Sequence, residues 1–414
     1  MQEIILITSS SRGGSSVFSE YLRRSEALIH LQGEINPFLV RVGLGFHDTD
    51  TRSDALEARH AAKTGPLLSL LRAELGNPTA SVDTPAAWTR FVAALTDRLT
   101  MQWPHLSIPH GEVMQAAATA LSRLQQQAGW PAGTIPEVGA FHAAFLAEIH
   151  SAIPGINPHY YDLSRTLIGR LCPTARPIGP PGPVIIEEPP FVTISPWQTA
   201  ETLDRPVIIK TPSNAYRLPF YAALFPDARL RIIHLTRNAA AAINGLYDGW
   251  RYPEGFYSIH LPGQLDIAGY SDAFPAFGRD WWQYDLPPGW ADWTGRPLEA
   301  VCGFQWRSAH QAILRFTEAN PHIDVHRIQF EDLIASEDRA RAAIDGLIDW
   351  LDITPDRALS QTTLLTMPLV MSTDKPRHRR WFEKAALLEP VLAREDTGSL
   401  MEALGYDPDP ETWI

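Results

Sequence analysis

The chain has 414 residues, of which 45% are hydrophobic and 20% are charged, a composition typical of a folded protein with a large core. Its 35 basic and 47 acidic residues give a formal net charge of -12, which disfavours nucleic acid as the main partner. Two cysteines, Cys172 and Cys302, make no disulfide framework and fit a reducing compartment. The sequence shows neither a signal-peptide pattern nor an apolar run of roughly eighteen residues. We therefore expect a cytoplasmic protein that does not bind membranes.

The opening stretch, residues 4–34, predicts a strand, a loop with glycines and a helix. Its apolar run, Ile4–Ile7, is typical of a buried parallel strand, and a helix is expected over about 17–24. The loop between them has five candidate phosphate-binding residues, Arg12, Gly13, Gly14, Ser15 and Ser16. Either of the last two serines is placed to cap the helix, and free N–H groups at a helix start favour an anion. A plain turn would need the same glycines, so the loop alone leaves both interpretations open.

This loop lacks the Gly-Lys-Ser/Thr of the kinase and GTPase P-loop, which disfavours ordinary ATP or GTP hydrolysis.

Residues 50–180, which follow the opening unit, carry apolar side chains at helical spacing, interrupted by proline and glycine. We interpret them as a helical insertion within a single domain spanning residues 1–414. The insertion contains no motif that indicates a function.

Further strands are predicted at four short apolar runs, 184–186, 207–209, 230–235 and 325–328. Helical segments separate most of them, which predicts an α/β fold with a parallel β-sheet flanked by helices. In such sheets ligands bind beyond the C-terminal ends of the strands. Five charged residues fall at those ends: Arg12, Glu34, Glu187, Lys210 and Arg237. The sequence therefore predicts a ligand site at this edge of the sheet.

Two later segments have compositions that suggest closure of such a site. Residues 251–296 are rich in proline, glycine, tryptophan and tyrosine, and a loop of this length is more typical of a lid than of a connector. The C-terminal tail, residues 355–414, contains the most basic run of the chain at 375–381. A solvent-exposed surface is the alternative interpretation of that run, but a basic tail packed near an anion site would close it.

Arg12 and Arg237 each stand at a strand end before a helix, which suits a ligand with two separated phosphate groups. Three stretches then match one family in its chain order: Ser10–Ser16, Arg231–Trp250, and Phe330–Leu333 with Ile348–Leu351. In these stretches the chain resembles the sulfotransferases that use 3′-phosphoadenosine 5′-phosphosulfate (PAPS), and in the aromatic segment it is similar to sulfotransferase domains of bacterial polyketide pathways. The resemblance implies a P-loop-like sulfotransferase fold and transfer of a sulfuryl group to a hydroxyl of a small-molecule or carrier-bound acceptor, in secondary metabolism.

The resemblance also implies roles for individual residues. Arg12 and the loop N–H groups would hold the 5′-phosphate, with Lys210 as a second candidate, and Arg237 would hold the 3′-phosphate. Glu34 is the first candidate for the base that accepts the proton of the acceptor hydroxyl, and His310 is the second. The scheme requires no metal. A divergent phosphotransferase and a non-catalytic nucleotide-binding module are the alternatives.

The chain departs from the family pattern at several positions. Gly13 stands where a serine is usual, and Gly245 stands where a serine binds the 3′-phosphate, so that Asn244 or a backbone N–H would replace that contact. The usual basic pattern of the tail is missing, and Lys375 and Arg377 are the candidates to take its place.

Overall fold

The computed structural model describes residues 3–31, 34–63, 65, 67–68, 71, 76–77, 82–103, 106–158, 169–170, 172–173, 195–196, 205–252, 258–367 and 377–413. The predicted strand at 184–186, with Glu187, lies outside these residues. Within them, no helix is long and apolar enough to cross a membrane.

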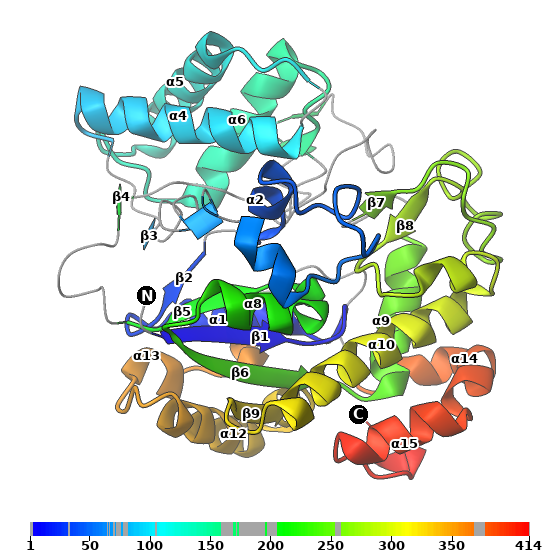
Figure 1. The fold of residues 1–414 in the computed structure, drawn as a ribbon. Helices are drawn as coiled ribbons and strands as arrows, with labels where there is room; N and C mark the ends of the chain where they lie inside the picture. The colour runs from blue at the N-terminus through cyan, green and yellow to red at the C-terminus, as the bar shows by residue number, and fades with distance from the viewer. Residues whose placement is uncertain are drawn as a thin grey trace.

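A five-stranded sheet, parallel throughout, forms the centre of the molecule, in the order β2-β5-β1-β6-β9 (Figure 1). The strands are β1 (Glu3–Thr8), β2 (Ile29–His30), β5 (Val207–Lys210), β6 (Arg229–Thr236) and β9 (Asp324–Gln329). β1 lies in the middle, with Ile4 opposite Val207 of β5 and Leu230 of β6. The prediction of a parallel α/β sheet is confirmed. Because all strands run in one direction, the loops after Thr8, Lys210 and Thr236 meet at one edge.

Successive side chains of β1 point to opposite faces of the sheet, and each face has its own core. Ile4 and Leu6 pack in one core cluster, and Ile5 and Ile7 pack in another. The first cluster includes residues from the helical elements α2 (Asn36–Arg41), η1 (Ala58–Lys63), η3 (Pro212–Tyr216), α8 (Leu218–Leu224) and α10 (Leu298–Ala319). Four helices supply the second: α1 (Ser15–Leu22), α11 (Asp332–Ala335), α12 (Glu337–Trp350) and α13 (Arg357–Ser360). The sheet is therefore covered on both faces, as the buried strand sequences require.

A third core cluster joins the aromatic segment and the tail to the helix that follows β6. Its elements are α9 (Ala239–Trp250), the hairpin β7 (Ser258–His260) and β8 (Trp281–Gln283), η4 (Trp290–Trp293), α14 (Ala385–Leu392) and α15 (Glu395–Ala403), with α10 beside them. Smaller 3-10 turns complete this half of the chain: η3 (Pro212–Tyr216), η5 (Leu364–Thr366), η6 (Arg380–Lys384) and η7 (Pro410–Thr412). The described part of the C-terminal tail, residues 377–413, thus packs against α9 and α10.

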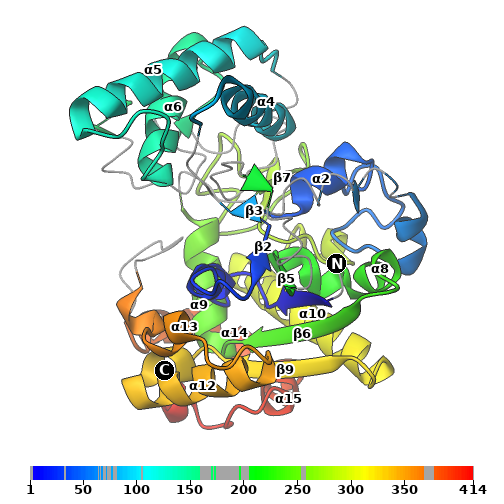
Figure 2. The same cartoon turned by 90° about the vertical axis from the view of Figure 1, so that its left-hand side faces the viewer.

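Three helices of the predicted insertion lie together on the far side of the molecule from β9 (Figures 1 and 2). They are α4 (Pro85–Gln102), α5 (His110–Ala128) and α6 (Val138–Ala152), and a short pair of strands, β3 (Gly76–Asn77) and β4 (Ser195–Pro196), lies nearer the sheet. The three helices share a core of their own, centred on aromatic residues such as Trp103, Phe141 and Phe145. The helical character predicted for this stretch is confirmed at these helices.

Candidate active site

The loop after β1 has a strained backbone that only its particular residues allow. Arg12 has a φ of 61° and Gly14 a φ of 93°, both in the left-handed region. Gly14, not Ser15 or Ser16, occupies the position before α1, and no side chain of the described residues caps that helix. The predicted serine cap was therefore wrong, because the chain enters α1 through a left-handed glycine. A helix that begins without a side-chain cap favours an anion near its first turn.

Gly13, where the family usually has a serine, has no room for a side chain. A Cβ atom built there would lie 2.1 Å from Ser9 Oγ and 2.8 Å from the carbonyl oxygen of Ser10, whose carbonyl accepts the Gly13 N–H at 3.0 Å. The tight turn between Ser10 and Gly13 thus explains this departure from the family pattern.

Gly14 lies directly against Phe330, which follows β9. A Cβ atom at Gly14 would stand 2.3 Å from the Phe330 ring, whereas one at Gly43, also a left-handed glycine (φ 73°), would meet nothing within 4 Å. We expect Gly14→Ala to lower the free energy of unfolding by about 1–3 kcal/mol more than Gly43→Ala, since only the first adds overpacking to backbone strain. Denaturant unfolding of the two variants measures the difference. Equal losses would show that the Phe330 ring moves aside without cost.

Arg237, at the end of β6, reaches the loop directly. Its Nη1 donates a hydrogen bond to the Arg12 carbonyl oxygen at 3.0 Å, and its guanidinium lies over the Phe330 ring, 5.2 Å from the centroid. Burial lowers the pKa of Arg237; Glu331 opposes this shift, and the positive charges of Arg12 and Arg380 add to it. Arginines from the first loop, from the β6 end and from the tail therefore act on one another electrostatically. Like charges gathered in this way favour an anion between them.

Gly245 of α9 provides space for the Arg12 side chain. A Cβ atom at Gly245 would lie 3.3 Å from Arg12 Cβ, so a serine there would press on the arginine. The neighbouring Asn244 is buried and accepts a hydrogen bond from Lys384 Nζ at 3.1 Å. The departures at Gly13 and Gly245 thus both follow from close packing around the loop that carries Arg12.

The tail reaches α9 with two cations that the sequence analysis did not single out. Arg380 and Lys384 pair with Asp248 of α9 at 2.6 Å and 2.8 Å. Arg377, a predicted phosphate ligand, pairs with Glu383 at 2.6 Å, and both side chains are about half exposed. Lys375 lies outside the described residues. The spacing of the basic residues within the run 375–381 does not indicate which of them contact α9.

Glu34 lies four residues beyond the end of β2, not at its last residue as the sequence suggested, and it is buried. Its Oε1 lies 3.0 Å from Lys210 Nζ. Its Oε2 accepts hydrogen bonds from Thr211 Oγ1 at 2.7 Å and from Asn36 Nδ2 at 3.0 Å. Lys210 Nζ also donates to Ser16 Oγ of α1 at 3.1 Å. Lys210 therefore links the candidate base to the start of the helix that follows the loop.

His310, the second candidate base, lies in the core between α10 and β6. Its side chain is fully buried, and its Nδ1 lies 3.0 Å from His234 Nε2. Its Nε2 has no hydrogen-bond partner among the described residues. Burial lowers the pKa of His310 to about 3, so the imidazole is neutral at physiological pH. The ring contacts of His310 are with His234 of β6 and with Trp306 on its own helix.

Glu331, in one of the stretches that resemble the family, contacts both α9 and the tail. The cap of α12 is Ser336, which accepts the Arg339 N–H. Glu331 Oε1 accepts hydrogen bonds from the Asn238 backbone N–H at 3.0 Å and from Asn238 Nδ2 at 2.7 Å. Its Oε2 accepts a hydrogen bond from Tyr406 in the tail at 2.9 Å. Glu331 thus holds the start of α9 directly beside Arg237.

The residues around the loop fit a donor that carries phosphate groups. The hydroxyl oxygens of Ser9 and Ser10 are buried and have no hydrogen-bond partner among the described residues, which is uncommon for buried polar atoms. The start of α1 offers N–H groups, and Arg12 and Arg237 supply positive charge. The described residues contain no group of three or more histidine, cysteine, aspartate or glutamate side chains able to hold a metal ion.

Comparison with known proteins gives low-identity structural matches. No family model matches the sequence. No curated protein matches it either. The chain is similar to a sulfotransferase domain from the curacin biosynthetic pathway (12% identity, TM-score 0.40, covering 98% of this chain and 99% of that one). It is also similar to the sulfotransferase domain of an olefin synthase from Synechococcus PCC 7002, with 14% identity and a TM-score of 0.34, covering 98% of this chain and 97% of that one. A third similar structure is the sulfotransferase STF9 from Mycobacterium avium, with 12% identity and a TM-score of 0.35, covering 98% of this chain and 78% of that one. Each is a sulfotransferase, the family that the sequence resembles.

Proposed function

We propose that this protein is a sulfotransferase that moves a sulfuryl group from PAPS to an acceptor hydroxyl. The observation that carries the proposal is the arrangement at the C-terminal edge of the sheet. There the uncapped start of α1, Arg12 and Arg237 lie beside one another, and Lys210 joins Ser16 to the buried carboxylate of Glu34. An anion site next to a positioned carboxylate suits a transfer in which a hydroxyl attacks an anionic donor.

Each residue has a defined task in this transfer. PAPS supplies the sulfuryl group and a bisphosphate leaving group. Arg12 and the N–H groups at the start of α1 bind the 5′-phosphate and stabilise the negative charge that grows on it, and Lys210 adds positive charge from the side of Ser16. Arg237 binds the 3′-phosphate, with the tail as the source of a further cation. Glu34 accepts the proton that the acceptor hydroxyl loses.

We propose an alcohol as acceptor, either free or bound to a carrier protein. The aromatic segment that packs on α9 contributes the partly buried Trp290 and Trp293, and indole side chains suit an apolar or aromatic alcohol. A cytoplasmic location and a role in secondary metabolism belong to the same proposal. They follow from the resemblance and from the sequence composition.

Binding of the product nucleotide tests the proposed function. We expect 3′-phosphoadenosine 5′-phosphate to raise the melting temperature of the wild-type protein, because a ligand that binds only the folded state stabilises it. ATP with magnesium is the matched comparison. Stabilisation by ATP with magnesium alone would favour a phosphotransferase, and binding of the bisphosphate without transfer from labelled PAPS to any of a panel of alcohols would favour a non-catalytic module.

A further inference from the structure

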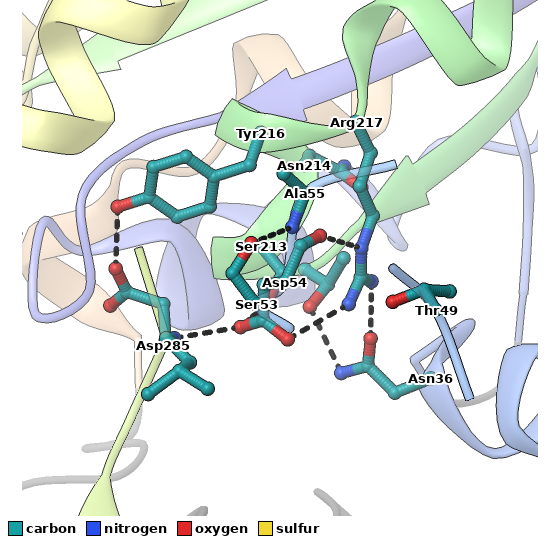
Figure 3. A network of polar contacts seen from close by, with 12 residues as sticks. Asn36, Thr49, Ser53, Asp54, Ala55, Ser213, Asn214, Tyr216, Arg217 and Asp285 are labelled. Atoms are coloured by element: carbon teal, nitrogen blue, oxygen red, sulfur yellow. Dashed lines mark hydrogen bonds and ion pairs between the residues drawn. The ribbon is translucent and has the colours of Figure 1, made fainter. Parts of the chain in front are cut away.

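A buried carboxylate from the aromatic segment holds the donor loop. Asp285 Oδ1 accepts a hydrogen bond from Ser11 Oγ, next to Arg12, and its Oδ2 accepts one from Tyr216 OH at 2.7 Å. Figure 3 shows Tyr216 and Asp285 facing each other at one side of a larger polar network. Asp285 is only 1% exposed, and its backbone carbonyl is itself held by Gln305 Nε2 at 2.8 Å.

The same network extends to Asn36 (Figure 3), and Asn36 contacts the candidate base. The residue after Asp285, Leu286, exchanges backbone contacts with Asp54: its N–H donates to Asp54 Oδ2 at 2.9 Å, and its carbonyl oxygen accepts the Asp54 N–H at 2.8 Å. Arg217 pairs with the other oxygen of Asp54 at 3.2 Å and donates to the side chain of Asn36. Asn36 donates in turn to Glu34. A continuous set of buried contacts therefore joins the loop that carries Arg12 to Glu34.

We propose that Asp285 is a positioning residue for the donor: through Ser11 and Tyr216 its carboxylate holds the loop after β1 in the conformation that presents Arg12 to the phosphates. The inference rests on the proposed function. The loop needs such a support because Arg12 has a left-handed backbone, which is unfavourable for a non-glycine residue unless its surroundings impose it. Asp285 acts through Ser11, not by touching the donor.

The charge of Asp285 makes this support dependent on pH. Burial raises the pKa of Asp285 to about 6; the hydrogen bonds from Ser11 and Tyr216 oppose the shift, and the nearby carboxylate of Asp54 adds to it. Two further groups interact electrostatically with this pair of carboxylates. Arg217 forms an ion pair with Asp54, and the charge of Asp285 is one of the causes that raise the pKa of Cys302 on α10. Above about pH 6 the carboxylate accepts both hydrogen bonds. Below it, the proton occupies one acceptor position, and the hold on Ser11 weakens.

The affinity for 3′-phosphoadenosine 5′-phosphate, measured by calorimetry at pH 7.5 and pH 5.5, tests the inference. Asn resembles the protonated aspartic acid, so we expect Asp285→Asn to bind the nucleotide about tenfold more weakly than wild type at pH 7.5. At pH 5.5, where most but not all of Asp285 is protonated, we expect the difference to fall to about threefold. Comparing the two proteins at each pH cancels the titration of the nucleotide itself. A ratio that stays constant between the two pH values would overturn the inference. So would tighter binding by Asp285→Asn, the result expected if Asp285 merely repelled the nucleotide.

Further variants separate positioning from a general loss of structure. Ser11→Ala removes the Ser11–Asp285 hydrogen bond from the serine side, so we expect it to weaken nucleotide binding at pH 7.5 as much as Asp285→Asn does. Because both substitutions remove the same contact, the double variant should bind the nucleotide no more weakly than either single variant. In turnover, Asp285→Asn should raise the KM for PAPS and leave the acceptor KM unchanged. Asp292→Asn, an exposed aspartate of the same segment, is the matched control and should bind like wild type at both pH values.

Failure of this inference differs from failure of the proposed function. Wild-type protein that does not bind the nucleotide at either pH would reject the function and the inference together. Wild-type binding that Asp285→Asn and Ser11→Ala leave unaltered would reject only the positioning role. Additive losses in the double variant would also reject it, because they would mean that Ser11 and Asp285 act separately.

Discussion

Replacing Arg12 is expected to abolish the stabilisation by 3′-phosphoadenosine 5′-phosphate and to lower kcat/KM for PAPS by about 10²–10³-fold, the usual cost of removing one group that stabilises developing charge. Arg12 combines two features that no other residue of the loop has: a guanidinium and a position next to the start of α1. Its backbone carbonyl oxygen accepts a hydrogen bond from Arg237, and replacing the Arg12 side chain keeps this acceptor. Thermal shift and transfer from labelled PAPS measure the two effects.

Arg12→Gln is the preferred variant, because it keeps a long side chain against Gly245. Arg237→Gln should give a loss of similar size. Arg341→Ala is the control: this arginine lies on α12, is about half exposed, pairs with Glu337 and donates a hydrogen bond to the Ser360 carbonyl oxygen. Unaltered nucleotide binding by Arg12→Gln would contradict the assignment of the loop as a phosphate site.

The tail arginines can be ranked in the same assay. Arg380 reaches Asp248 on α9 and acts electrostatically on Arg237, whereas Arg377 pairs with Glu383. On these contacts we expect Arg380→Ala to weaken nucleotide binding more than Arg377→Ala. The opposite order would favour the assignment made from the basic run alone.

Replacing Glu34 by glutamine is expected to lower kcat by about 10²–10⁴-fold, the range for loss of a general base, while the nucleotide still binds. Glutamine has nearly the same shape and can accept the hydrogen bond from Thr211, but it cannot take up a proton at neutral pH. It also leaves Lys210 without its carboxylate partner, so the melting temperature should fall. Single-turnover transfer from PAPS separates the chemical step from binding.

Glu20→Gln is the matched control, since Glu20 is a half-exposed glutamate on α1 that pairs with Arg23 of the next turn. His310→Ala tests the second candidate. Because His310 is fully buried against His234, its loss should lower stability and leave the chemical step of the folded protein intact. A fully active Glu34→Gln together with an inactive, folded His310→Ala would reverse the order of the two candidates.

Much of the fold follows from local patterns that the sequence shows directly. The run Ile4–Ile7 is apolar at every position because both faces of β1 are covered, and this is why its strand was predicted to within a residue at each end. Boundaries failed where a long-range contact decides them: the start of α1 is set by the left-handed Gly14 packed on Phe330, which no cap rule foresees.

The sequence by itself determined that strands alternate with helices, and that Arg12, Glu34, Lys210 and Arg237 belong near strand ends. These are properties of neighbouring residues, and the parallel direction of the strands then brings the ends to one edge. Only the tertiary structure decided the pairings among them, because their partners are remote in the chain. Ser11 and Asp285 are 274 positions apart, and Lys210 and Glu34 are 176 apart. Such contacts depend on how the whole chain packs around the sheet. Residues that are brought together only by this packing show no periodic or local pattern in the sequence.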